Sequence, residues 1–368
     1  MRAFVLVALL TMAVLPVSAK TNDKAAKELS KDPRALLAAA APYYDFSSPD
    51  LKPWHLKATY QLYDADGKPT EQGTYEYWWA SPQVYRSTWT RTGASESDWT
   101  TAEGRYVEIG PGDGLDYYEY ALKRELLTPL PDADLLQSEN SLLASKHVDN
   151  GSMEMECVMV MSKHLGIDSI AAIPMGMLPT YCFDAHSRAL LASYSFGGLT
   201  AQFPQVIRTQ GHYLAKMIVL SENGHKVLSA SVEALDSAAV SDPAFTPSHD
   251  AKSMPPAGLN TADLIHMDYS TIFKTGNLIH QISPVYPEQA RQSRVQGTVV
   301  LRAIIGKDGN VHGLRVVSAP SALLIGSSIA AVSQWKYKPF LIKGKPVAVE
   351  TKIRVIYSLS GSTSFDFR

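Results

Sequence analysis

The sequence predicts an α+β protein built from two domains of different character. In residues 51–240, side chains alternate between apolar and polar at a period of two, which is typical of antiparallel strands. Residues 263–368 contain the order helix, strand, strand, helix, strand, which favours a small layer of helices on a sheet. Between them, residues 241–262 hold four prolines among small and polar residues, so we expect a linker there.

The bulk composition argues against nucleic acid as a partner. The formal net charge of the 368 residues is −2, with 34 basic and 36 acidic side chains. A protein that binds nucleic acid or an anionic membrane surface usually carries a basic excess on one face. We therefore expect no nucleic-acid partner.

Residues 1–19 have the layout of a secretory signal peptide. Arg2 supplies the positive charge, residues 3–15 form an apolar run, and residues 17–19 (VSA) form a small-x-small cleavage site. A spanning helix needs about 20 apolar residues, and Pro16 interrupts the run earlier. We expect cleavage after this segment and export of the protein. The alternative is an uncleaved segment that anchors the chain in the inner membrane.

The next segment, residues 20–50, is a polar lead-in with one short helix. Asp32 suits the N-cap of that helix and Pro33 its first turn. The strands expected in residues 51–240 are 56–63, 74–80, 83–90, 105–109, 153–161, 180–185, 189–196, 213–220 and 226–235. Helical inserts are expected at 121–127 and around 135–145.

The chain has two cysteines, Cys157 and Cys182, both in strand-like runs. An exported protein meets an oxidising environment, so we expect a disulfide between them. Two buried free thiols are the alternative. A metal site is a weaker interpretation, because the sequence has no CxxC motif and no histidine pair nearby.

Elements of the second domain can be read directly from its residues. Glu288 favours the start of a helix, and GTVVLRAIIG from Gly297 is a strand with one apolar face. The turn KDGN (307–310) leads into a return strand, and an amphipathic helix follows Pro320. The last strand, 347–359, alternates apolar and polar side chains over its whole length. We expect a three-stranded antiparallel sheet with helices on one face.

Short motifs follow one another in a fixed order through residues 276–360. They are PxYP (284–287), AR (290–291), GTV (297–299), DGxV (308–311), AAV (330–332), WKYxP (335–339) and GxPV (344–347). This set resembles the C-terminal domain of TonB-family proteins, over about a quarter of the chain. The resemblance implies a periplasmic domain in which six motif residues support the fold. They are Tyr286, Pro287, Gly297, Trp335, Tyr337 and Pro339.

The resemblance also implies a mode of binding. In that family the domain receives a short extended segment, the TonB box, from an outer-membrane transporter as an added strand. The final strand is the expected edge, because an edge strand offers unpaired N–H and C=O groups. The predicted partner-binding residues are Val349, Thr351, Ile353, Val355 and Tyr357. The alternative is an edge covered by the first domain or by a neighbouring chain.

The chain departs from the family in its N-terminal half. A TonB-type energy transducer has a permanent inner-membrane helix and a long spacer, whereas this sequence predicts a cleavable signal peptide and a short linker. Force transmission from the inner membrane is therefore not expected. A periplasmic binding protein is the favoured hypothesis, and an anchored transducer is the alternative.

The N-terminal domain is rich in aromatic residues between Tyr75 and Trp89. Such residues can line a site for an apolar ligand or simply form the core of a sheet, and the second interpretation is favoured. The strand pattern is loosely similar to the half-barrel of periplasmic lipoprotein-carrier proteins; a sandwich-like arrangement is the other option. The third hypothesis is accordingly a lipid or lipoprotein carrier.

No motif in the sequence predicts catalysis, a cofactor or a metal. The glycine-rich stretch 110–114 lacks the Lys and Ser or Thr of a phosphate-binding loop, and DADG (64–67) lacks the glutamate that ends a calcium loop. We expect a protein that is not an enzyme and whose partner is a protein or peptide of the cell envelope.

Overall fold

The computed structural model describes most of the chain. The described residues are 30–111, 117–131, 141–149, 151, 153–163, 169–171, 173, 175–195, 198–254, 265–266, 278–342, 344–359 and 364–366. The expected signal peptide (1–19), the start of the lead-in and the end of the linker (255–262) lie outside them. No helix within the described ranges is long and apolar enough to cross a membrane.

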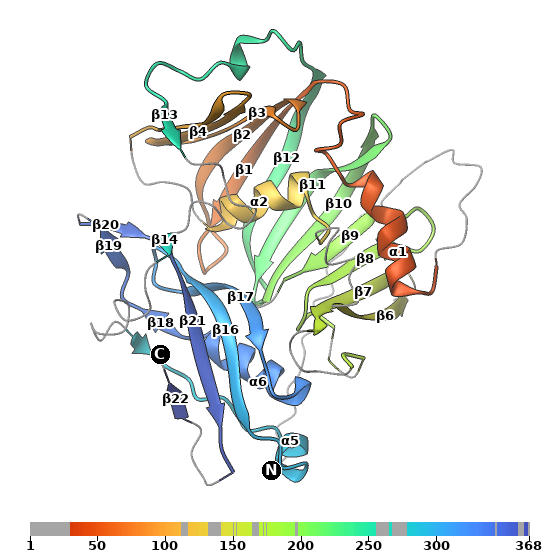
Figure 1. Ribbon diagram of the computed structural model, residues 1–368, viewed down its shortest axis with the longest axis vertical. Helices are drawn as coiled ribbons and strands as arrows, with labels where there is room; N and C mark the ends of the chain where they lie inside the picture. The colour runs from red at the N-terminus through yellow and green to blue at the C-terminus, as the bar shows by residue number, and fades with distance from the viewer. Residues whose placement is uncertain are drawn as a thin grey trace.

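The N-terminal domain is one strongly curved antiparallel sheet (Figure 1). Its strands within the described ranges are β1 Trp54–Tyr63, β2 Pro69–Ser81, β3 Val84–Arg91, β4 Ala94–Thr101, β5 Gly104–Ile109, β6 Ser141–Asp149, β7 Glu154–Ser162, β8 Thr180–Asp184, β9 Leu190–Tyr194, β10 Leu199–Thr209, β11 His212–Glu222, β12 His225–Ser237 and β13 Lys252–Met254. The order across the sheet is β13-β5-β4-β3-β2-β1-β12-β11-β10-β9-β8-β7-β6. Strands β13 and β6 lie at the two edges of the sheet and do not pair with each other. The sheet therefore stays open as a half-barrel.

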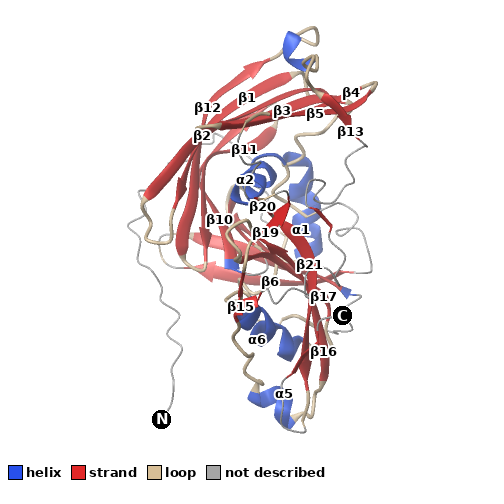
Figure 2. Cartoon of the chain, turned by 90° about the vertical axis from the view of Figure 1, so that its left-hand side faces the viewer, coloured by secondary structure: helices blue, strands red, loops and turns tan. Residues whose placement is uncertain are grey.

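Two helices, α1 Pro33–Ala40 and α2 Tyr117–Leu127, lie in the hollow of this sheet (Figure 2). A one-turn 3-10 helix, Ala41–Tyr43, follows α1. Asp32 caps α1 as expected, because its carboxylate accepts hydrogen bonds from the two N–H groups that follow Pro33. Alternate residues of the strands point inward, which gives β1 its regular burial pattern and places one common core between sheet and helices.

The expected helix at 121–127 is confirmed as the second half of α2. The helix expected around 135–145 is wrong over 141–145, where the chain is already in β6. Nine residues of β6 pair with β7, from Ser141 opposite Ser162 to Asp149 opposite Glu154. A long ladder of this kind outweighs the weak local helix preference of LLAS.

The C-terminal domain is built on the expected antiparallel core β17–β16–β21. Its strands are β16 Gly297–Ile305, β17 Val311–Ser318 and β21 Val349–Tyr357, and two short strands, β14 Ile265–His266 and β22 Ser364–Asp366, join β21. Helices α5 Glu288–Gln292 and α6 Ala322–Val332 complete it, with two small hairpin-like pairs. Those pairs are β15 Leu278–His280 with β18 Lys336–Tyr337, and β19 Phe340–Ile342 with β20 Lys345–Val347.

The final strand is shorter than the range 347–359 expected from the alternation. Val347 belongs to β20 and pairs with Phe340, so β21 begins only at Val349. The alternation itself continues across this break, which is why the pattern alone did not reveal it.

The two domains pack against each other through β7 and α6. Val158 and Val160 belong to the core of the half-barrel, whereas Met159 and Met161 belong to the core of the C-terminal domain. On the other side, a Cβ added to Gly326 of α6 would lie 2.6 Å from Cε of Met177. Helix α6, expected to be amphipathic, is thus buried between its own sheet and the half-barrel.

The first half of the predicted linker lies along the half-barrel. A 3-10 helix, Pro243–Phe245, covers β4, where the Trp99 indole Nε1 donates a 3.0 Å hydrogen bond to the Ala244 carbonyl. The chain then forms β13, which pairs with β5. Residues 243–245 and 252–254 of the expected linker therefore contact the half-barrel.

Candidate functional site: the outer edge of β21

Strand β21 uses its two edges differently. One edge pairs with β16 along its whole length, from Val349 opposite Ile305 to Tyr357 opposite Gly297. The other edge carries β14 in parallel at 349–350 and β22 antiparallel at 354–356. Within the described part of the chain, no strand pairs with residues 351–353 on that edge. The backbone there can hydrogen-bond to an added strand.

The five predicted partner-binding residues all direct their side chains into the domain core. They are Val349, Thr351, Ile353, Val355 and Tyr357, and none is more than 5% exposed. Any contact between these residues and a partner strand must therefore run through their backbone N–H and C=O groups. Side-chain selectivity has to come from the other face of β21, which carries Lys352 and Arg354.

Three of the predicted motif residues hold the ends of the core strands. The Tyr286 hydroxyl donates to the Val295 carbonyl, and its ring meets the Tyr357 ring edge-on with centroids 5.2 Å apart. Pro287 occupies the N-cap of α5. Gly297 has φ +132°, and a Cβ there would lie 3.2 Å from the Pro320 ring.

Two of the other three motif residues, Trp335 and Tyr337, fasten the loops behind the sheet. The buried Trp335 donates from Nε1 to the Ile282 carbonyl at 2.8 Å. The Tyr337 N–H donates to the Gly309 carbonyl at 2.8 Å, and Gly309 approaches so closely that a Cβ would lie 1.9 Å from the Tyr337 oxygen. Pro339 is exposed. The motif residues therefore support the fold rather than line the edge.

The predicted disulfide is confirmed: Cys157 and Cys182 are bonded. They lie directly opposite each other on β7 and β8, and both are fully buried. The bond therefore links neighbouring strands of the half-barrel, close to where β7 contacts the C-terminal domain.

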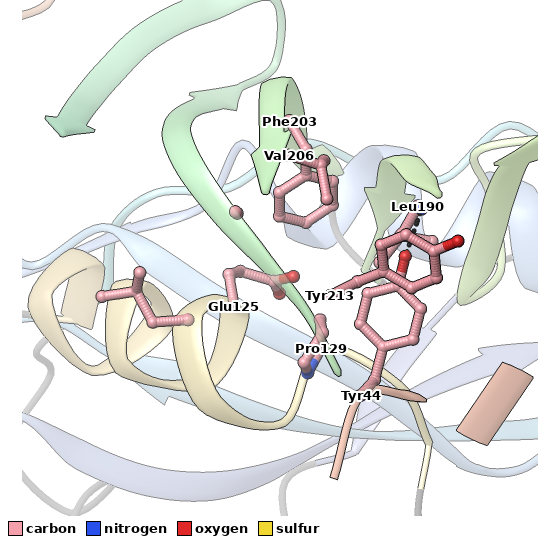
Figure 3. Close-up of a pocket in the computed structure, with 9 residues that line it drawn as sticks. Tyr44, Glu125, Pro129, Leu190, Phe203, Val206 and Tyr213 are labelled. Atoms are coloured by element: carbon pink, nitrogen blue, oxygen red, sulfur yellow. Dashed lines mark hydrogen bonds between the residues drawn. The ribbon is translucent and has the colours of Figure 1, made fainter. Parts of the chain in front are cut away.

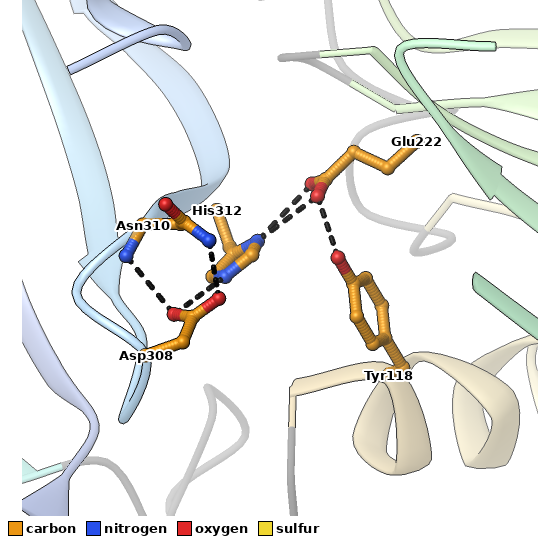
Figure 4. A network of polar contacts seen from close by, with 5 residues as sticks. All are labelled: Tyr118, Glu222, Asp308, Asn310 and His312. Carbon is orange, nitrogen blue, oxygen red and sulfur yellow. Dashed lines mark hydrogen bonds and ion pairs between the residues drawn. The ribbon is translucent and has the colours of Figure 1, made fainter. Parts of the chain in front are cut away.

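Sequence reasoning missed a polar network that joins the two domains (Figure 4). His312 of β17 lies with Nδ1 3.1 Å from Oε2 of Glu222, at the end of β11, and with Nε2 3.3 Å from Oδ1 of Asp308. The Tyr118 hydroxyl of α2 donates to the same Glu222 carboxylate at 2.7 Å. The partners are up to 194 residues apart in the chain, so no local signal could have indicated them.

The charges in this network explain the ionisation of its members. Burial alone would lower the pKa of His312, but hydrogen bonds to Asp308 and Glu222 outweigh it and raise the pKa to about 10. Burial would raise the pKa of Asp308, yet the hydrogen bonds from His312 and Asn310 lower it to about 2. The interface therefore contains a protonated imidazole between carboxylates at neutral pH.

The aromatic cluster of the N-terminal domain forms the core of the half-barrel. Tyr75, Tyr77, Trp79 and Trp89 are buried, and the Tyr75 and Trp89 rings stack with centroids 4.0 Å apart. Figure 3 shows a small cavity at helix α2, lined by Tyr44, Glu125, Leu190, Phe203 and Tyr213 among others. It has room for about one water molecule. In this conformation the helices and aromatic side chains fill the concave face.

Helix α2 is held in the hollow by buried carboxylates as well as by apolar contacts. Glu119, which is fully buried, accepts a hydrogen bond from Tyr60 and lies 3.8 Å from Nε of Arg91. Glu125 is paired with Arg124 and accepts a 2.9 Å hydrogen bond from Ser193. Among the described residues, no three His, Cys, Asp or Glu side chains are grouped so as to hold a metal ion.

The C-terminal domain is similar in sequence to known proteins. Residues 282–359 match the family model described as "Gram-negative bacterial TonB protein C-terminal". The match is to the TonB C-terminal family. A Protein TonB of Vibrio cholerae serotype O1 is 32% identical over 82 residues, which cover 22% of this chain. The chain spans 34% of that relative's length.

Three solved structures are similar to this chain at TM-scores below 0.4 and sequence identities of 9–10%. A DUF1329 family protein from Desulfovibrio piger has a TM-score of 0.38 at 10% identity, covering 60% of this chain and 98% of its own. A LolA superfamily protein from Nitrosomonas europaea scores 0.36 at 9% identity, with coverages of 57% and 97%. An outer-membrane lipoprotein-sorting protein domain from Vibrio parahaemolyticus scores 0.34 at 10% identity, with coverages of 54% and 89%.

Proposed function

We propose that this protein works in the periplasm as a non-enzymatic binding protein. Its TonB-type domain takes an extended segment of a cell-envelope partner, such as an outer-membrane transporter, as an added strand on the outer edge of β21. The observation that carries the proposal is the stretch 351–353, which has no strand partner on that edge within the described ranges. The family match of residues 282–359 supports the same function.

The half-barrel serves as a scaffold for the TonB-type domain in this proposal. Its β7 contributes Met159 and Met161 to the core of that domain, and Glu222 pairs with His312. The alternative hypotheses remain an energy transducer anchored by residues 1–19 and a carrier of an apolar ligand. The carrier hypothesis requires α2 to leave the hollow, because the helix now fills it.

Proline substitution tests strand addition directly. Successive residues of a strand direct their N–H groups to opposite edges. Of the two single variants Lys352→Pro and Ile353→Pro, one therefore removes an N–H donor on the outer edge and the other removes one that faces β16. Binding of synthetic peptides carrying the N-terminal extended segments of outer-membrane transporters is measured by fluorescence anisotropy on the mature protein. We expect the variant that loses the outward donor to stay folded and to bind at least about tenfold more weakly, because a proline blocks the ladder.

A matched control lies on the opposite edge of the same sheet. Val317→Pro changes an exposed residue of β17 and leaves β21 intact. Thermal unfolding establishes that each variant is folded before binding is compared. Peptide affinity that is equal in the wild type and in every folded β21 variant would overturn the proposal.

A further inference from the structure

Sulfur-containing side chains line one face of β7, where the half-barrel meets the C-terminal domain. Alternate residues of a strand share a face, so Met155, Cys157, Met159 and Met161 lie on the same side of the sheet. Met155 packs against the disulfide that Cys157 forms, whereas Met159 and Met161 belong to the core of the C-terminal domain. A stripe of sulfur atoms therefore runs along β7 from the disulfide into the interface between the domains.

Two further methionines, Met175 and Met177, lie in the turn before β8, and both are partly exposed. Met175 packs against the disulfide within the half-barrel. Met177 instead lies against helix α6 of the C-terminal domain, because a Cβ added to Gly326 would be 2.6 Å from its Cε and 3.2 Å from its Sδ. The thioether therefore fills the space beside Gly326, and Met177 is a contact between the domains that solvent can reach.

The surface of α6 beside Gly326 suits an apolar group. Inside a helix, each backbone N–H is bonded to the carbonyl four residues earlier. The hydroxyl of Ser327 donates to the Val285 carbonyl, and the hydroxyl of Ser328 donates to the Leu324 carbonyl at 2.8 Å. These donors are already in use, so a polar atom pressed against this surface would lose its hydrogen bonds to water without gaining new ones.

We propose that Met177 is a site of reversible oxidation, and that its sulfoxide weakens the contact between α6 and the half-barrel. The oxidant is hydrogen peroxide. The thioether sulfur attacks one peroxide oxygen, the S–O bond forms as the O–O bond breaks, and the other oxygen leaves as water after taking up the proton. Sulfur loses two electrons and the peroxide gains them. Methionine sulfoxide reductases reverse the change.

The consequence follows from the shape and polarity of the product. Oxidation turns a flexible apolar side chain into a larger, polar one, which disrupts contacts built from methionine. At Met177 the added oxygen would lie beside Gly326, where α6 has no donor to spare. The inference is independent of strand addition at β21, because it concerns the contact between the two domains.

Peroxide treatment of the full-length mature protein tests the proposal. Mass mapping of peptides locates the added oxygen, and we expect it at Met177 before Met159 and Met161, which are only 2% exposed. Hydrogen exchange of the α6 amides should then become at least about fivefold faster, and treatment with methionine sulfoxide reductases should restore the slow exchange. The β1 amides, in the half-barrel, should exchange as before.

Three results of this experiment would overturn the proposal. The first is a Met177 that peroxide leaves unoxidised. The second is an oxidised Met177 with unchanged exchange at α6. The third is equal acceleration at α6 and β1, which would mean general unfolding instead of a local change at the interface.

Matched variants assign the effect to one sulfur atom. Met177→Leu keeps the approximate volume without the reactive sulfur, so its α6 exchange should not respond to peroxide. Met175→Leu removes the partly exposed neighbour that does not contact α6, and it should respond as the wild type does. A peroxide response in Met177→Leu, or its absence in Met175→Leu, contradicts the assignment.

A further variant tests the polarity argument without any oxidant. Met177→Gln places an uncharged polar group of similar length at the same point. Its α6 amides should exchange faster than those of the untreated wild type, to about the extent that peroxide produces. Exchange as slow as in the untreated wild type would show that polarity at this position does not weaken the contact.

Discussion

His312 of the C-terminal domain forms a buried ion pair with Glu222 of the half-barrel, with Nδ1 3.1 Å from Oε2. The imidazole also stacks on Tyr117 of α2, with ring centroids 5.1 Å apart. The His312 side chain therefore contacts both the end of strand β11 and helix α2, which lies in the concave face of the half-barrel. The C-terminal domain is therefore fastened to the half-barrel at a defined point.

Removing this contact should destabilise the whole protein. We expect His312→Gln to reduce the free energy of unfolding by about 3 kcal/mol, because it leaves a partly buried carboxylate without its cation. Urea denaturation followed by tryptophan fluorescence measures the change. His249→Gln, at a fully exposed histidine, is the control and should have almost no effect. A loss below about 0.5 kcal/mol would show that the pair does not hold the domains together.

The same pair predicts how stability depends on pH. The pKa of His312 is raised from 6.5 to about 10, so the stabilisation by its protonated form is complete below pH 6.5 and disappears as pH rises toward 10. The pKa of Asp308 is lowered from 3.8 to about 2, so its contribution is complete above pH 3.8 and disappears as pH falls toward 2. The stability difference between wild type and His312→Gln should therefore shrink between pH 6.5 and 10. A difference that is constant over this range would contradict the assignment.

Gly309 should tolerate no side chain. Gly309→Ala places a Cβ 1.9 Å from the Tyr337 carbonyl oxygen in a backbone with φ +81°, and we expect a loss of at least about 2 kcal/mol. Gly344→Ala is a matched control, because φ is also +81° and no described atom lies within 4 Å of the new Cβ. Its loss should be about 1 kcal/mol, the strain of the left-handed region alone. Thermal unfolding compares them, and equal losses would exclude the contact as the cause.

The disulfide should contribute substantially to stability. Cys157 and Cys182 are 25 residues apart, and a loop of that length corresponds to about 3.5 kcal/mol in the chain-entropy description. Guanidinium denaturation with and without reductant measures the contribution. The Cys157→Ser/Cys182→Ser double variant should have the same guanidinium midpoint as the reduced wild type. Adding reductant should not change that midpoint. A wild type that is equally insensitive would mean that the bond does not form in solution.

The exported form of the protein should begin at Lys20. Intact-mass measurement and N-terminal sequencing of protein purified from the periplasmic fraction check this prediction. An Ala19→Leu variant should block cleavage, because the small-x-small motif no longer ends in a small residue. Wild-type protein that keeps Met1 in the membrane fraction would favour the anchored transducer.

Much of the C-terminal domain could be predicted from its residues. The alternation in β16 and β21, the turn at 307–310 and the motif around Trp335 are local signals, and each element formed where they indicated except at the ends of β21. The helix expected around 135–145 failed because pairing with β7, which is not a local property, decided the conformation of β6. The candidate edge was predicted as a strand that pairs through its backbone, but only the tertiary structure showed that the side chains of its five predicted residues are buried.

By itself, the sequence determined the alternating strands, the pairing of the two cysteines and the TonB-type module. These features depend on periodicity, turn residues and motif order, which are properties of residues close together in the chain. Only the tertiary structure decided that Asp366 is opposite Arg354, that Glu222 meets His312 and that α6 lies between two sheets. These relationships join residues from separate elements. Their energies come from burial and charge pairing across the fold, which no local stretch of sequence encodes.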